Sequence, residues 1–172
     1  MFRGARQLDT EAELYEIALR ALTRRAHSVQ EMKQKLERRS NNKLLVQVVM
    51  ARLKENGLLD DARYATQFAR QRTELRQQGK FRVARDLRAR GVTDKHIGAA
   101  LEEAAEHNDE ATMVRQRIAR KLRLLRGEID DRKIASIYSS LMRAGFPADV
   151  IRRELKSLTT EDIPDAEIGG ES

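Results

Sequence analysis

Apolar residues recur every three to four positions along most of this chain, which is the period of an amphipathic α-helix. Thr10 followed by Glu13 forms a capping box, so a first helix is predicted to begin there. Ser28 with Glu31 forms a second capping box and predicts a second helix. A third helix is predicted to end at Asn56-Gly57, because glycine commonly follows a helix C-terminus. The opening third of the chain therefore predicts three short helices.

A segment of similar sequence occurs three times, at 36–50, 87–101 and 141–155, with offsets of 51 and then 54 residues. Each copy begins with leucine and then has a turn residue, which is Ser40, Gly91 or Gly145. Repeats of this kind indicate one supersecondary unit stacked on copies of itself. This architecture favours a long binding surface over a single deep catalytic pocket.

The repeat predicts an all-α fold built from three tandem three-helix repeats. The expected boundaries are a flexible N-terminus at 1–9, repeats at 10–58, 59–108 and 109–158, and an acidic disordered tail at 159–172. Each repeat is too small to bury much apolar surface alone, so neighbouring repeats are expected to share cores.

Composition agrees with a helical fold, because aromatic residues make up only 4% of the chain and strands favour aromatic and β-branched residues. There are 34 Lys and Arg against 27 Asp and Glu, a net charge of +7. Five of the acids and no base lie in 157–172, so the preceding residues carry +12. This balance favours a polyanion or an acidic protein surface as the partner. Simple solubility is the alternative.

Motifs for catalysis are weak. There is no cysteine, which excludes a disulfide framework and thiolate chemistry. His27, His96 and His107 lack the spacing of a zinc motif, so solvent-facing or capping histidines are the simpler interpretation. The pairs Asp60-Asp61 and Asp130-Asp131 fall at predicted helix starts, where carboxylates cap. We therefore expect no enzyme activity, no cofactor and no metal.

No apolar run approaches the roughly 20 residues of a membrane span, and the N-terminus lacks the apolar core of a signal peptide. A cytoplasmic protein that does not enter the membrane is expected.

Arginine supplies the strongest functional signal, because its forked donors suit phosphate and carboxylate oxygens. Between Gln67 and Arg85 there is one acid, Glu74, against six bases. We expect this excess of positive charge to have no ion-pair partner within the protein. The alternative is that many of these bases pair with nearby acids, each pair contributing about 0.3–0.5 kcal/mol. The residues expected to bind a partner or DNA are Arg24, Arg25, Arg63, Tyr64, Arg70, Arg72, Lys80, Arg82, Arg85 and Arg88. Phe68 and Phe81 are interleaved with them; core packing is the simpler role for Phe68.

Three motifs in order resemble the RecX family of regulatory proteins, modulators of the RecA recombinase. They are Ala18-Leu19-Arg20-Ala21-Leu22-Thr23-Arg24-Arg25 leading into Ser28-x-x-Glu31-Met32-x-x-Lys35-Leu36, then Gly57-Leu58-Leu59-Asp60-Asp61-Ala62-Arg63-Tyr64-Ala65, and Leu141-Met142-Arg143-Ala144-Gly145-Phe146. The middle motif, at the junction of two repeats, is the most specific.

The resemblance implies an elongated, curved array lying in the groove of the RecA filament on single-stranded DNA, with double-stranded DNA as a further ligand. It implies a protein without chemistry of its own that inhibits RecA ATPase, filament extension and strand exchange. A monomer is expected because repeats that share their cores need no partner chain to fold. Such a protein acts in homologous recombination, the response to DNA damage and the SOS response. The alternatives are a general single-stranded nucleic-acid-binding helical repeat protein and a pure protein scaffold.

Overall fold

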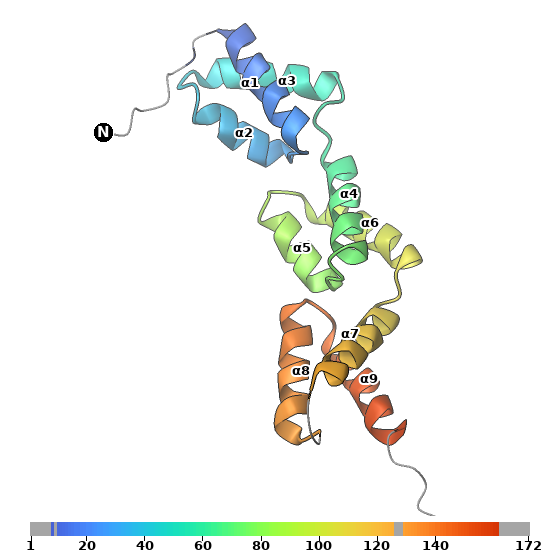
Figure 1. Ribbon diagram of the computed structural model, residues 1–172. Coiled ribbons are helices and arrows are strands. Elements are labelled where there is room, and N and C mark those ends of the chain that lie inside the picture. The colour runs from blue at the N-terminus through green and yellow to red at the C-terminus, as the bar shows by residue number, and fades with distance from the viewer. Residues whose placement is uncertain (1–7, 9, 126–128, 162–172) are drawn as a thin grey trace, which may run out of the picture. The chain divides into compact units, whose positions relative to one another are not determined.

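A computed structural model describes residues 8, 10–125 and 129–161. Over these residues the chain forms nine helices and no strand, which confirms the predicted all-α fold (Figure 1). The helices are α1 (Glu11–Arg24), α2 (Val29–Glu37), α3 (Lys43–Glu55), α4 (Asp61–Glu74), α5 (Lys80–Arg88), α6 (Asp94–His107), α7 (Glu110–Leu124), α8 (Asp131–Arg143) and α9 (Ala148–Glu161).

Local sequence signals explain where several helices begin. The side chain of Thr10 accepts a hydrogen bond from the Glu13 backbone at the start of α1. Ser28 and Glu31 form a reciprocal capping box at the start of α2. Each cap satisfies backbone N–H groups that the first turn of a helix leaves without an intrahelical partner. The capping box predicted at Ser28 is therefore confirmed, and at Thr10 the N-cap hydrogen bond of the predicted box is present.

The first aspartate of each pair caps the helix that follows it, as predicted. Asp60 Oδ1 accepts from the Arg63 backbone N–H at 3.0 Å at the start of α4. Asp130 Oδ1 accepts from the Lys133 backbone N–H at 2.8 Å at the start of α8. At the end of α3, Gly57 has a φ of 64°, a left-handed conformation that glycine adopts without a steric penalty.

The chain divides into two compact units, each built from two stretches of sequence. Unit 1 comprises residues 1–70 and 84–103, and unit 2 comprises 71–83 and 104–172. The divisions fall inside α4, α5 and α6, so these middle helices contribute residues to both units.

The core of unit 1 joins α1, α2 and α3, which pack on one another (Figure 1). Leu14, Met32, Leu36 and Leu53 are fully buried in it. Leu8 is also part of this core, and its backbone N–H donates to the Arg39 carbonyl at 2.8 Å. Leu8 was assigned to a flexible N-terminus, which is incorrect for this residue because apolar burial anchors it. The rest of that segment, 1–7 and 9, lies outside the described residues.

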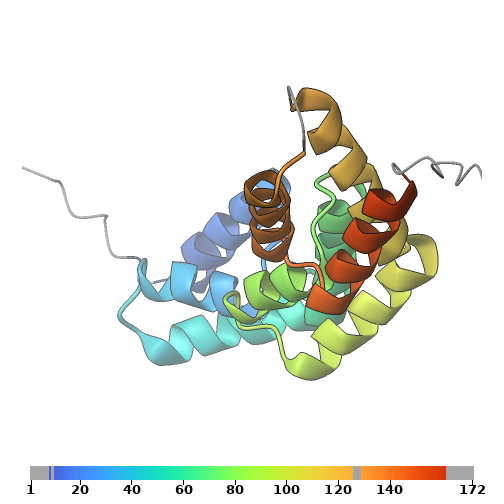
Figure 2. The same ribbon diagram turned by 90° about the horizontal axis from the view of Figure 1, so that it is seen from below.

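In unit 2, α7, α8 and α9 share a second core that includes Ile118, Leu141 and Phe146. Helix α9 packs along α7 (Figure 2). Glu154 is only 4% exposed and pairs with Arg115 Nε at 2.9 Å, which compensates the buried carboxylate. Helix α9 continues to Glu161, past the expected start of the acidic tail at 159; the remaining part of that tail, 162–172, lies outside the described residues.

A close backbone contact joins the turn before α5 to the corner between α8 and α9. The Gly79 N–H donates to the Ala144 carbonyl at 2.9 Å, and the Phe81 N–H donates to the Gly145 carbonyl at 3.1 Å. A Cβ atom on Gly79 would overlap the backbone of Gly145. Only glycine at position 79 permits this approach.

The equivalent corner exists in unit 1. Ser28 Oγ donates to the Arg90 carbonyl at 2.6 Å, and the side chain of Gln30 covers Gly91. The repeat offsets of 51 and 54 residues place Ser28 on Gly79 and Gly91 on Gly145. The same contact between successive repeats is therefore built twice.

Alanine substitutions at two glycines should have opposite effects. Gly79→Ala should destabilise the protein by about 1–3 kcal/mol, because the new methyl group is forced into packed backbone. Gly98→Ala, in open space inside α6, should stabilise it by about 0.5–1 kcal/mol through helix propensity. Urea unfolding followed by far-UV circular dichroism measures both. Equal stability of the two variants would contradict the close contact.

Candidate nucleic-acid interface

The structure divides the ten predicted binding residues between the two units. Unit 1 holds Arg24, Arg25, Arg63, Tyr64, Arg70, Arg85 and Arg88, and unit 2 holds Arg72, Lys80 and Arg82. All of the predicted unit 1 cations are exposed: Arg24, Arg25, Arg63, Arg70, Arg85 and Arg88. Several of the ten already take part in internal contacts, which limits what each can offer to a ligand.

Glu31 organises the contacts of unit 1. Arg25 Nη1 lies 3.0 Å from Glu31 Oε2, and Arg90 Nε lies 3.8 Å from Oε1. The Tyr64 hydroxyl donates to the same carboxylate at 3.4 Å. Burial opposes ionisation, but the hydrogen bonds from Arg25 and the Ser28 backbone outweigh it and lower the pKa of Glu31. Arg25 is therefore a structural group as well as a candidate contact.

Tyr64 is a core residue in this structure. Its side chain is 7% exposed, and its ring stacks on that of Phe68 with centroids 6.0 Å apart. Arg90 covers the Phe68 ring at 4.7 Å. Phe68 is buried, as the simpler interpretation held, whereas Phe81 is 59% exposed and presents an accessible aromatic surface.

The motif from Gly57 to Ala65 connects the first three helices to α4. Asp61 Oδ1 accepts from the Val29 N–H at 2.8 Å, so it caps α2 from another part of the chain. Arg63 donates from Nη2 to the Gly57 carbonyl and closes the turn. The most specific motif of the sequence is thus the structural joint between two helix triplets.

In unit 2, the basic excess before Arg85 has internal partners that the sequence did not reveal. Lys80 Nζ lies 3.2 Å from Glu110 Oε2, and its backbone N–H donates to Glu110 Oε1 at 3.1 Å. Arg82 Nη1 donates to the Arg143 carbonyl at 3.2 Å. The expectation that this excess has no internal partner is wrong, because folding brings Glu110 to Lys80 from thirty residues away.

Helix α7 carries a basic surface that the sequence analysis missed. Residues 111–125 contain five bases and no acid. Arg115 pairs with Glu154, and Arg117 Nη1 donates to the Gln77 carbonyl at 2.6 Å. Arg120 and Arg123 are exposed and line a hollow on α7; neither forms an ion pair with the described residues. The run of bases without an acid was the signal that could have found it.

The lowered pKa of Arg117 shows that positive charge is concentrated around this residue of α7. Burial lowers the pKa of Arg117, and the charges of Arg120 and Arg82 lower it further. Mutual repulsion of this kind marks a site where cations outnumber their counter-charges. An anion placed beside these guanidinium groups would relieve it.

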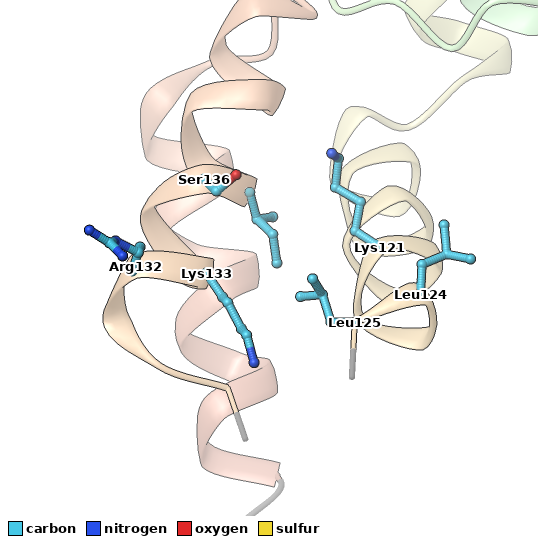
Figure 3. Close-up of a pocket in the computed structure, with 7 residues that line it drawn as sticks. Lys121, Leu124, Leu125, Arg132, Lys133 and Ser136 are labelled. Atoms are coloured by element: carbon cyan, nitrogen blue, oxygen red, sulfur yellow. The ribbon is translucent and has the colours of Figure 1, made fainter. Parts of the chain in front are cut away.

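A second hollow lies between the end of α7 and the start of α8 (Figure 3). It is lined by Lys121, Leu124, Leu125, Arg132, Lys133, Ser136 and Ile137. Its lining combines apolar side chains with cations and one serine, Ser136. A serine hydroxyl acts as a nucleophile when a neighbouring base, such as a carboxylate or an imidazole, takes its proton. Neither group lines this hollow.

The described part of the chain brings no three His, Cys, Asp or Glu side chains together in an arrangement that could hold a metal ion. The histidines were expected to face solvent or to cap helices. His27 does not face solvent, since it is only 7% exposed, but its Nδ1 lies 2.9 Å from the carbonyl oxygen of Arg25, the C-cap residue of α1. Within the same described residues, no helix has the length and apolar character needed to span a membrane.

Comparison with known proteins agrees with this architecture. The family model for the first three-helix domain of RecX matches residues 15–53, and that for the second matches 60–101. A crystal structure of regulatory protein RecX superposes with a TM-score of 0.73 at 20% identity, covering 85% of this chain and 71% of the other. RecX from Lactobacillus salivarius gives 0.74 at 19%, covering 87% and 97%. These likenesses define a helical protein with the RecX fold.

Sequence relatives carry the identification further. Regulatory protein RecX of Halorhodospira halophila is 38% identical over 148 residues, covering 86% of this chain and 89% of the relative. Regulatory protein RecX of Thermobifida fusca is 30% identical over 166 residues, covering 94% and 89%. The chain belongs to the RecX family, and the predicted resemblance is confirmed. These relatives are named as regulators, and no catalytic family is indicated.

Neutralising Glu31 should reduce stability in a pH-dependent way. The pKa of Glu31 in the folded state lies below the ordinary value of 4.5, so its ionised form stabilises the fold above that value. Glu31→Gln should cost about 1–2 kcal/mol at neutral pH. That difference should shrink as the pH falls through the lowered pKa. Urea unfolding across this range measures it.

Glu37→Gln is the control, because Glu37 is exposed on the same helix and lies 3.9 Å from Lys33. It should change stability by less than about 0.5 kcal/mol at any pH. A cost at Glu31 that persisted unchanged into acid would show that lost packing, and not charge, is responsible.

Proposed function

We propose that this protein binds the RecA nucleoprotein filament on single-stranded DNA and inhibits its ATPase, its extension and strand exchange during recombination and DNA repair. The observation that carries the proposal is the uncompensated positive charge of α7, centred on Arg117, Arg120 and Arg123. Membership of the RecX family supports it, since relatives are named as regulators.

Charge of this kind suits a nucleoprotein filament. Guanidinium groups that contact phosphates release condensed counterions, which contributes affinity without sequence preference. The same groups can pair with carboxylates on a protein surface, where complementary charge accelerates association. A filament of protein and DNA presents both kinds of partner along its length.

The remaining predicted contacts lie in both units. Arg24, Arg63, Arg70, Arg85 and Arg88 are exposed in unit 1, and Arg72, Lys80 and Arg82 belong to unit 2. We assign these residues to the interface with RecA or DNA. Arg25, which is exposed but paired with Glu31, and the buried Tyr64 support them. Double-stranded DNA is a further ligand of the same chemistry.

The protein would act by occupying the filament and not by chemistry of its own. In this proposal it is a cytoplasmic monomer with repeats at 10–58, 59–108 and 109–158. The acidic segment 159–172 extends beyond them. Its task belongs to the response to DNA damage, including the SOS response.

Titrating the protein into RecA with single-stranded DNA, while following ATP hydrolysis, tests this function. We expect inhibition well below one molecule per RecA subunit, since each bound protein would block filament growth beyond its own site. No effect up to stoichiometric amounts would overturn the proposal. Tight binding to naked single-stranded DNA in that case would favour the general nucleic-acid binder.

Removing charge from α7 should weaken DNA binding and reduce its salt dependence. For Arg120→Gln with Arg123→Gln, the slope of log affinity against log salt should fall by about 1–2, one counterion for each lost phosphate contact. Fluorescence anisotropy of a labelled oligonucleotide measures the slope. Lys54→Gln with Lys95→Gln removes the same charge from exposed sites in unit 1 and should leave the slope nearly unchanged. Equal effects of the two pairs would mean that net charge alone matters.

A further inference from the structure

A hollow of about 610 Å³ lies beside α1 and α2 in unit 1. Its polar lining residues are all cations or histidine: Arg20, Arg24, Arg25, His27, Lys35 and Arg39. No carboxylate lines it. The sequence analysis named Arg24 and Arg25 as separate contacts, but the structure places them around one cavity with residues of α2.

The cations of this hollow are only partly compensated. Arg20 pairs with Glu16 at 2.5 Å, and Arg25 pairs with Glu31 at 3.0 Å. Arg24, Lys35 and Arg39 form no ion pair with the described residues. The hollow therefore presents at least three positive charges that an anion could neutralise.

His27 makes the hollow more than a group of surface cations. Its Nδ1 lies 2.9 Å from the Arg25 carbonyl oxygen. A carbonyl oxygen only accepts, so Nδ1 carries the hydrogen, and Nε2 of the neutral ring bears a lone pair. Nε2 is the nitrogen left for an occupant, and it becomes a donor to an anion only when the ring is protonated.

The charges around His27 oppose that protonation while the hollow is empty. Burial lowers its pKa below 6.5, and the charges of Arg25 and Lys35 lower it further. The hydrogen bond to the Arg25 carbonyl and the charge of Glu31 raise the pKa of His27, but they do not cancel this lowering. Arg20 and Arg24 of α1, and Arg39 after α2, add positive charge around the same hollow. An anion would offset these cations.

We propose that this hollow is a phosphate-binding site in which His27 takes up a proton as the anion binds. The ligand is a phosphate group, supplied either by a nucleic-acid backbone or by free phosphate. Arg24, Lys35 and Arg39 attract the anion, and protonated His27 donates from Nε2. The nucleic-acid source rests on the proposed function, whereas the site itself rests only on the geometry of unit 1.

Proton linkage gives the site a definite sign. Binding raises the pKa of His27. For a phosphodiester, whose own charge is constant near neutral pH, affinity is therefore highest at acid pH and falls as the pH rises between the empty and bound pKa values of His27. A rise of about one pKa unit corresponds to a change of about tenfold in affinity across that window. A site built from arginine and lysine alone would bind a phosphodiester with little pH dependence there.

NMR titration of the imidazole C–H signals of the full chain tests the site directly. Inorganic phosphate should raise the pKa of His27 relative to sodium chloride at equal ionic strength. His96 and His107 are internal controls and should not respond. An unchanged His27, or an equal shift of all three histidines, would overturn the proposal.

Lys35 on α2 and Arg39 just after it are both exposed, so substituting them tests the site without disturbing core packing. Lys35→Gln with Arg39→Gln should abolish the response of His27 to phosphate. Lys33→Gln, on α2 but outside the lining, should preserve it. Loss of the response with Lys33→Gln as well would show a general charge effect and count against a built site.

The source of the phosphate is decided with an oligothymidylate that has no terminal phosphate. If the backbone is the ligand, the oligonucleotide should bind several-fold more tightly at pH 6 than at pH 8, and His27→Gln should remove most of that difference. A response to inorganic phosphate alone would assign the site to free phosphate. A His27 response without RecA inhibition would retain this site and reject the proposed function; inhibition without a His27 response would do the reverse.

Discussion

The stability of unit 1 depends on the compensation of one half-buried carboxylate, that of Glu31. A buried charge is tolerated only when hydrogen bonds and opposite charges replace its hydration. Arg25 supplies them from the end of α1, the Ser28 backbone from the start of α2, Tyr64 from α4, and Arg90 from the corner after α5. Because these groups come from separate helices, the compensation of one carboxylate links four elements of unit 1.

Unit 2 builds the equivalent corner by other means. Gly79 and Gly145 approach through their backbones, where unit 1 uses the Ser28 side chain. The repeat offset of 51 residues places Arg82 at the position of Glu31, so the charge at the corner is reversed. Arg82 then adds to the repulsion that lowers the pKa of Arg117. The two corners therefore share their geometry, but one carries a carboxylate where the other carries a guanidinium group, so the two units differ in their electrostatics.

Function in such a fold depends on surfaces. Each three-helix repeat uses its apolar face for a core, and the exposed faces remain for ligands. In unit 2 the cations of α7 lie on such a face; in unit 1 those around His27 line a hollow. The first arrangement suits a long polyanion, and the second suits a single phosphate group whose binding responds to pH.

The sequence by itself determined the helical class, the N-caps at Thr10 and Ser28, and the repeated turns at Gly91 and Gly145, because these depend on residues within a few positions of one another. It also identified the family through its motifs. Only the tertiary structure decided that Lys80 is paired with Glu110, that Tyr64 is buried and that His27 lines a hollow. Those contacts join residues from different helices or depend on their packing, and local periodicity carries no information about such partners.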